Sequence, residues 1–312
     1  MKRLLIPFLI FIIIASGCSN AASTNSEKTS KKLQIVTTFY PMYYFAKKVA
    51  GSSANVELLI PNGVEPHDWE PTAKDMAKIQ DADVFIYNSQ SFELWTDKVL
   101  KSINDSKLTV VEASKGIKLM DAVESEEEDE HGHSEHSTAK DPHVWLSPVL
   151  AQQEVNTIAK AIEQADPKNK DQYQKNAADI NSQLGDLDRL YKETVVKAKK
   201  KEFVTQHAAF GYLAKQYGLT QIPIAGLSPD VEPTLGKLAE LTDLTKKKKV
   251  KIIYFEEMTS SKVAETLAKE IGAKTEVLNP LEGLTKEEQQ KGLDYLDVMK
   301  KNLESLKLSI LD

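Results

Sequence analysis

The sequence predicts an α/β protein made of two βα lobes, each with a mainly parallel four-stranded sheet, joined by one long rigid helix. Short runs rich in β-branched residues alternate with helical patterns in both halves of the chain, which is the signature of parallel βα units. A polar helical stretch without strand signals separates the two halves. With 312 residues, of which 41% are hydrophobic, the chain is also long enough to build two cores.

The first lobe is expected over residues 33–166 and the second over residues 201–312. Each lobe contains four runs that favour strands, bounded by turn residues or helical patterns. In the first lobe the predicted strands are residues 33–38, 56–60, 84–87 and 108–111. In the second lobe they are residues 202–205, 221–225, 250–255 and 274–278.

The connecting helix is expected over residues 167–200. Pro167 stands where a helix can begin, and residues 171–200 contain no further proline. Apolar positions recur at helical spacing through this stretch, at Ile180, Leu184, Leu187, Leu190 and Tyr191. A single long helix would make a stiff connection between the lobes.

The N-terminus has the features of an export signal. Lys2 and Arg3 precede an apolar run, residues 4–15, that is shorter than the ~20 residues of a membrane-spanning helix. Small residues then lead to Cys18, the single cysteine of the chain, in a pattern that resembles a bacterial lipobox. We therefore expect a signal peptide at residues 1–17, a lipid on Cys18, a flexible tether at residues 18–32, and an extracytoplasmic protein held at the membrane.

Charge argues against a nucleic-acid partner. The formal net charge is −6, whereas proteins that bind a phosphate backbone usually concentrate basic residues on one face. The lysine run at residues 246–249 stands between a predicted helix and a predicted strand, where a solvated helix end explains it.

An acidic segment, residues 121–140, interrupts the first lobe. It is a low-complexity loop in which His131, His133 and His136 alternate with glutamates and an aspartate. Two interpretations remain open: a solvated linker, or an auxiliary site that captures metal ions weakly through its imidazoles.

Three further histidines stand in unusual settings. His67 lies in a proline-rich turn after a predicted strand, His207 follows another predicted strand, and His143 precedes a helix. Ligands of open α/β sheets bind outside the carboxyl ends of the strands, so a cleft between the lobes would collect these side chains. Glu65, Asp68 and Asp141 are close enough in sequence to accept the second N–H of a ligating imidazole.

Three imidazoles and one carboxylate make a closed tetrahedral shell suited to Zn²⁺. The carboxylates that end predicted strands of the second lobe are Glu256, Glu257 and Glu282, and their positions alone do not rank them.

Four segments carry a resemblance to a known family: PHDWEPT around His67, DPHVWLSP around His143, QHAAFGYLAKQYGL around His207, and IPIAGLSPDVEPT after it. They resemble the zinc and manganese branch of the metal-binding solute receptors of bacterial ABC transporters, over residues 33–312. The resemblance implies a monomeric receptor that binds a zinc ion and passes it to a cognate ABC permease. It also implies His67, His143 and His207 as ligands, with Glu282 of the NPLE segment as the fourth.

Three other functions fit the sequence less well. Manganese receptors of the same branch carry a carboxylate where His207 stands and another near Asn279, and both differences point to zinc here. An exported zinc hydrolase would need an open coordination position, which a fourth protein ligand would close, and the chain has no HExxH motif. A surface adhesin would not explain three isolated histidines. We therefore expect no enzymatic activity.

Overall fold

The structure is a computed structural model that describes residues 31–103, 107–122, 139–229, 231 and 233–312. The predicted signal peptide at residues 1–17, Cys18, and the tether up to residue 30 lie outside the described residues. So do His131, His133 and His136 of the acidic loop.

The first lobe is built on a parallel sheet with strand order β2-β1-β3-β4. Its strands are β1 (Leu33–Thr37), β2 (Ala54–Leu58), β3 (Val84–Tyr87) and β4 (Thr109–Glu112). The helices between them are α1 (Tyr40–Ala50), α2 (Ala73–Asp81) and α3 (Thr96–Ser102). Residues 84–87 are all buried, as expected for a central strand covered by helices on both faces.

The second lobe repeats this arrangement with strand order β6-β5-β7-β8, again all parallel. Its strands are β5 (Glu202–Thr205), β6 (Thr220–Pro223), β7 (Ile252–Phe255) and β8 (Lys274–Val277). Its helices are α6 (Gly211–Tyr217), α7 (Leu235–Lys247), α8 (Lys262–Ile271), α9 (Lys286–Gln290) and α10 (Tyr295–Ile310). The predicted fold of two lobes with four-stranded parallel sheets is thus confirmed.

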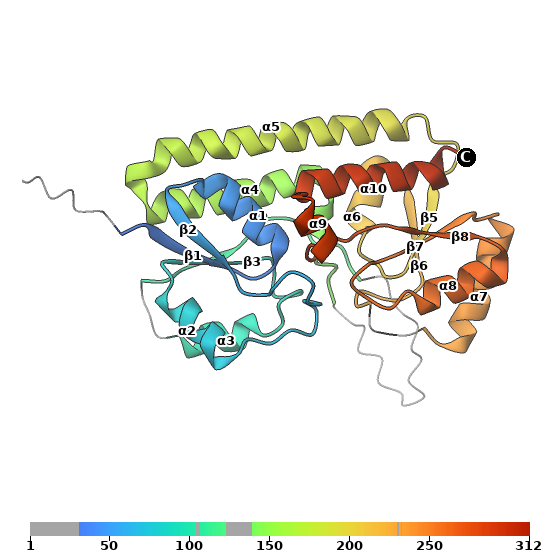
Figure 1. Cartoon of the computed structure of the whole chain (residues 1–312), viewed down its shortest axis with the longest axis horizontal. Helices are drawn as coiled ribbons and strands as arrows, with labels where there is room; N and C mark the ends of the chain where they lie inside the picture. Colours follow the sequence, from blue (N-terminus) through green and yellow to red (C-terminus); the bar gives the residue numbers. More distant parts are fainter. Residues whose placement is uncertain (1–30, 104–106, 123–138, 230, 232) are drawn as a thin grey trace, which may run out of the picture. The chain divides into compact units, whose positions relative to one another are not determined.

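Long helices join the two lobes (Figure 1). A 3₁₀ turn, η1 (Val144–Leu146), leads into α4 (Pro148–Ala165), and a second turn, η2 (Pro167–Asn169), leads into α5 (Lys170–Val195). The long helix expected from Pro167 is present, but it ends at Val195, before the expected residue 200. Val196 is already 85% exposed, so little burial would reward a longer helix.

One continuous cluster of buried side chains extends through both lobes. It takes in Ile35 and Ile86 of the first sheet, Leu184 of α5, and Phe203 and Tyr254 of the second sheet. Separate clusters cover the opposite face of each sheet, packed against α2 and α3 in the first lobe and against α7 and α8 in the second. The shared core gives a physical reason for a stiff connection between the lobes. In the described part of the chain, no helix is both long and apolar enough to cross a membrane.

Candidate metal centre

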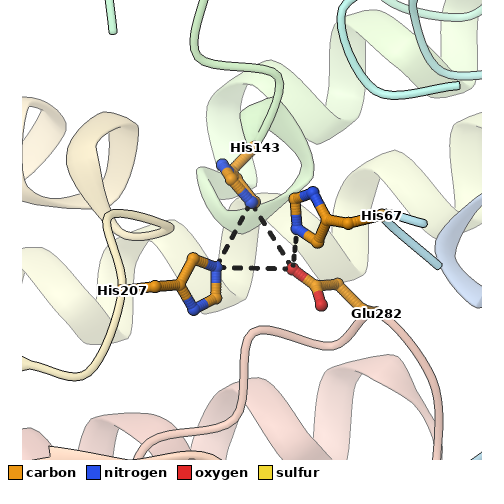
Figure 2. Close-up of side chains that lie close together, drawn as sticks. All are labelled: His67, His143, His207 and Glu282. Atoms are coloured by element: carbon orange, nitrogen blue, oxygen red, sulfur yellow. Dashed lines mark hydrogen bonds and ion pairs between the residues drawn. The ribbon is translucent and has the colours of Figure 1, made fainter. Parts of the chain in front are cut away.

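Four side chains that are far apart in sequence meet between the two sheets. His67 lies in the loop after β2, His143 directly precedes η1, His207 follows β5, and Glu282 follows β8. Figure 2 shows the three imidazole rings and the carboxylate directed at one another. One ligand atom from each residue lies within 4.8 Å of all the others. The structure therefore brings together the three histidines selected from the sequence and Glu282, the carboxylate that the family resemblance implied.

Four of the distances between donor atoms are close to the edges of a small tetrahedron. Glu282 Oε1 lies 3.2 Å from His67 Nε2, 3.4 Å from His143 Nε2 and 3.6 Å from His207 Nε2. The Nε2 atoms of His143 and His207 are 3.4 Å apart. Four ligands placed ~2.0–2.1 Å from a central ion lie about 3.3–3.4 Å from one another in an ideal tetrahedron. These four separations fit a tetrahedral Zn²⁺ site, and all four donor atoms lie within 4.8 Å of one another.

The centre is buried. The side chains of His143 and His207 are fully inaccessible, that of Glu282 is 2% exposed and that of His67 is 11% exposed. Burial alone would raise the pKa of Glu282, but the positive potential of His67 and hydrogen bonds from the three imidazoles hold this pKa well below its usual value. Glu282 is thus ionised and ready to bind a cation.

Two of the imidazoles are oriented by a carboxylate on their other nitrogen. His143 Nδ1 lies 2.8 Å from Asp141 Oδ1, which also accepts the backbone N–H of His143. His207 Nδ1 forms a hydrogen bond with Glu256 Oε1. With Nδ1 as the donor to its carboxylate, Nε2 faces the centre and can offer its lone pair to a zinc ion that displaces the Nε2 proton.

The other carboxylates considered from the sequence have different positions. Glu65 accepts the backbone N–H of His67 at 2.9 Å, while Asp68 is exposed. Burial raises the pKa of Glu257, which lines a surface pocket together with Lys300 and Lys301. Glu256 was considered as a ligand, but the sequence did not show its contact with His207. That contact depends on β5 and β7 being neighbours in the sheet.

Aromatic rings form one wall of the centre. The ring of Phe92 lies 4.8 Å from that of His67, and the indole of Trp145 lies 5.2 Å from the ring of His143. The two aromatic residues also pack against each other, with ring centroids 5.1 Å apart. A low-polarity wall of this kind strengthens the attraction between a cation and the carboxylate.

Gly211 lies directly against the Asp141 carboxylate. A Cβ atom at position 211 would lie 2.9 Å from Asp141 Oδ2 and 2.9 Å from Met120 Cε. We expect Gly211→Ala to displace Asp141, to loosen the orientation of His143, and to lower zinc affinity about 10-fold to 100-fold, the range typical of residues that orient metal ligands. Competition titration with a zinc chelator measures this loss.

Gly185→Ala is the matched control for Gly211→Ala. Gly185 lies in α5, and its added Cβ would lie 3.7 Å from Gln152 Nε2 of α4, which is an ordinary contact distance. This control should leave zinc affinity unchanged and the helix slightly more stable. A Gly211→Ala protein that binds zinc like the control would show that Asp141 does not orient His143 for binding.

The chain is similar to known proteins over most of its length. Residues 35–308 match the family described as "Zinc-uptake complex component A periplasmic". The high-affinity zinc uptake system protein ZnuA of Bacillus subtilis is 58% identical over 302 residues, which cover 96% of this chain and 95% of that protein.

Solved structures with the same fold are also found. The metal-dependent lipoprotein YcdH of Bacillus subtilis has 57% sequence identity and a TM-score of 0.78, covering 90% of this chain and all of that chain. The Zn(II)-bound ZnuA-like domain of Streptococcus pneumoniae AdcA has 48% identity and a TM-score of 0.78, with the same coverage of both chains. At these levels of identity the likeness extends beyond the fold to the sequence.

Proposed function

The chain belongs to the family "Zinc-uptake complex component A periplasmic", and from this premise we propose that it is an extracytoplasmic receptor that captures Zn²⁺ and delivers it to an ABC permease. In this role zinc is the cargo. The protein binds and releases the ion without changing the charge of the ion. The related proteins are named for zinc uptake and for zinc-bound states, which supports a receptor without catalytic activity.

The observation that carries the proposal is the set of donor atoms. Three imidazole nitrogens and one carboxylate oxygen, from His67, His143, His207 and Glu282, lie within 4.8 Å of one another, and four of their separations, 3.2–3.6 Å, fit a tetrahedral zinc site. Three imidazoles favour Zn²⁺ over Mn²⁺, which is better served by oxygen ligands. A shell of four protein donors also fits storage and transfer of an ion better than hydrolysis, which needs a position for water.

Metal titration tests the proposal. The mature protein, freed of metal by a chelator, is titrated with Zn²⁺ and separately with Mn²⁺. We expect one tightly bound zinc ion per chain, which an equal concentration of Mn²⁺ does not displace. Absence of a tight zinc site, or preferential binding of Mn²⁺, would contradict the proposed function.

The acidic loop is proposed to be an auxiliary part of this receptor. Its described base is a short stem: Ala122 N–H donates to Ala139 O at 2.9 Å, and Asp121 and Lys140 form a bridge and an ion pair. His131, His133 and His136 would raise the local concentration of zinc without belonging to the buried centre. Deleting residues 124–137 should therefore leave folding and the tight site intact. Loss of that site in calorimetry would refute this division of roles.

The N-terminal segments are proposed to export the chain and to anchor it, with residues 1–17 removed and Cys18 carrying the lipid. YcdH, which is similar over 90% of this chain, is described as a lipoprotein. We propose residues 18–32 as the tether, residues 33–166 and 201–312 as the lobes, and residues 167–200 as the connector of a monomeric receptor.

Cys18→Ser should abolish lipid attachment, because serine has no thiol to form the thioether. The variant is expected to leave the membrane fraction, or to keep its signal peptide and migrate at a higher apparent mass, while zinc affinity stays unchanged. Membrane fractionation and zinc titration measure the two properties separately. A serine variant that remains in the membrane at the mass of the wild-type protein would rule out anchoring through Cys18.

A further inference from the structure

Glu282 belongs to the second lobe by sequence, yet hydrogen bonds to the first lobe flank it on both sides. Two residues before it, Pro280 O accepts a hydrogen bond from Trp145 Nε1 at 2.8 Å. Two residues after it, Leu284 N–H donates to Asn62 Oδ1 at 3.2 Å. In the sequence, Trp145 is close to His143, and Asn62 is close to His67. The two hydrogen bonds thus join the segments that carry three of the four donors.

The turn that carries Glu282 has a backbone conformation that needs support. Leu281 has φ 60°, in the left-handed region that a leucine rarely adopts, and its side chain is fully buried. Its backbone N–H donates to Asn279 Oδ1 at 2.7 Å. Asn302 of α10 in turn donates to Asn279 O at 2.7 Å and accepts the Asn279 N–H at 2.9 Å. The carboxylate therefore stands on a turn whose shape is fixed by several hydrogen bonds.

The chain that follows this turn continues to contact the first lobe. The Tyr295 hydroxyl donates to Trp145 O, and the Tyr44 hydroxyl donates to Asp294 Oδ2 at 3.1 Å. The rings of Tyr44 and Tyr295 are stacked, with their centroids 5.4 Å apart. The segment from Pro280 to Tyr295 is thus bonded to the first lobe near both of its ends.

His207 has different partners. Its carbonyl oxygen accepts hydrogen bonds from Thr205 Oγ1 at 2.7 Å and from Gln221 Nε2 at 2.9 Å, and its ring bonds to Glu256. All three partners lie in or directly after strands β5, β6 and β7 of the second sheet. The hydrogen bonds to the His207 carbonyl oxygen and to its Nδ1 therefore all come from the second lobe.

We propose that Trp145 and Asn62 are positioning residues that hold Glu282 in place for zinc. The first lobe then presents His67, His143 and Glu282 as a preformed group of three donors, and His207 is the donor that the second lobe adds. This inference rests on the proposed function, because it assigns roles around the same zinc centre. Neither residue contacts the ion; both act through the backbone on either side of Glu282.

A double-mutant cycle tests the proposal with Zn²⁺ alone as the probe. Zinc affinity is measured by chelator competition for the wild-type protein, Trp145→Phe, Glu282→Ala and the double variant. Trp145→Phe removes the indole N–H and keeps an aromatic ring. It should lower affinity about 10-fold when Glu282 is present, as expected for a residue that orients a ligand. In the Glu282→Ala background the same substitution should change affinity less than about 2-fold, because the carboxylate that it positions is gone.

Two further variants exclude a general effect on packing. Trp95→Phe removes an indole N–H that is buried but has no hydrogen-bond partner among the described residues, so it should leave zinc affinity unchanged. Asn62→Ala removes the second hydrogen bond from a half-buried loop position outside the hydrophobic core. Like Trp145→Phe, it should lower zinc affinity when Glu282 is present and have little effect in the Glu282→Ala background. It replaces Trp145→Phe in the test if that variant fails to fold.

The contradicting results are distinct from failure of the proposed function. If the wild-type protein binds zinc tightly but Trp145→Phe and Asn62→Ala weaken binding equally with and without Glu282, neither residue acts through Glu282 and the proposal is wrong. It is also wrong if both variants bind as the wild-type protein does. If the wild-type protein itself has no tight zinc site, the proposed function fails, and the roles assigned to Trp145 and Asn62 fail with it.

Discussion

Glu282→Ala is expected to lower zinc affinity by more than about 100-fold, beyond the range seen for residues that only orient ligands. Glu282 supplies a carboxylate oxygen that lies within 3.6 Å of all three imidazole Nε2 atoms. Its removal would also take one negative charge out of this buried centre, which weakens the attraction for a cation. Chelator competition over a wide range of chelator strengths measures the loss.

Glu256→Ala is the matched control for this variant. It removes a glutamate of similar burial that bonds to His207 Nδ1 and does not belong to the group of donors. We expect a smaller loss of zinc affinity, about 10-fold to 100-fold. Near-wild-type affinity for Glu282→Ala, or a larger loss for Glu256→Ala, would remove Glu282 from the ligand set.

Zinc affinity is expected to rise steeply with pH, from about pH 6 to about pH 8, because zinc must displace protons from the imidazoles. Burial alone would lower the pKa of His207, but Glu256 and Glu282 outweigh it and raise the pKa to about 10. Burial likewise opposes charging of His143, yet hydrogen bonds to Asp141 and Glu282 raise its pKa above the ordinary value. The His207 ring therefore carries a second proton in the metal-free protein near neutral pH, and the His143 ring holds its second proton to a higher pH than a free imidazole does.

The raised pKa values determine the direction in which zinc affinity changes with pH. Below the raised pKa, each ring that loses a proton on binding adds about a tenfold increase in affinity per pH unit. This dependence ends only when pH exceeds the raised pKa. Affinity should therefore keep rising well above pH 6.5, where a free imidazole would already be neutral. Calorimetry in buffers of different ionisation enthalpy counts the protons released. An affinity that levels off near pH 6.5, with no proton release at pH 7.5, would be evidence against the raised pKa values.

The sheets could be predicted from sequence because buried parallel strands leave a strong local signal. The predicted strands at residues 84–87 and 202–205 match β3 and β5. The second strand was predicted at residues 56–60, but β2 spans Ala54–Leu58. Asn55 is a poor strand former, and the backbone N–H groups of Leu59 and Ile60 still donate to Thr37 and Thr38 after the strand ends. Local preference alone could not locate these two ends.

The three histidines could be selected from sequence because only three of the six histidines lie outside the acidic loop, and two of these follow predicted strands. Position alone did not rank the carboxylates, and Glu282 was implied by the family resemblance. Their supporting residues could not be found in the same way. The contact between Glu256 and His207 depends on the order of the strands in the second sheet. The hydrogen bond from Trp145 to Pro280 joins residues 135 positions apart. Such pairings follow from the packing of whole elements and leave no pattern in the local sequence.

The central claim is that one zinc ion binds between His67, His143, His207 and Glu282. The most direct test is a crystal structure of the zinc-loaded mature protein, with anomalous diffraction recorded at the zinc absorption edge. We expect a single strong peak at this centre, about 2.0–2.2 Å from the three Nε2 atoms and from a Glu282 carboxylate oxygen. A peak at another site, or a zinc ion at this site with a water molecule in place of Glu282, would contradict the claim.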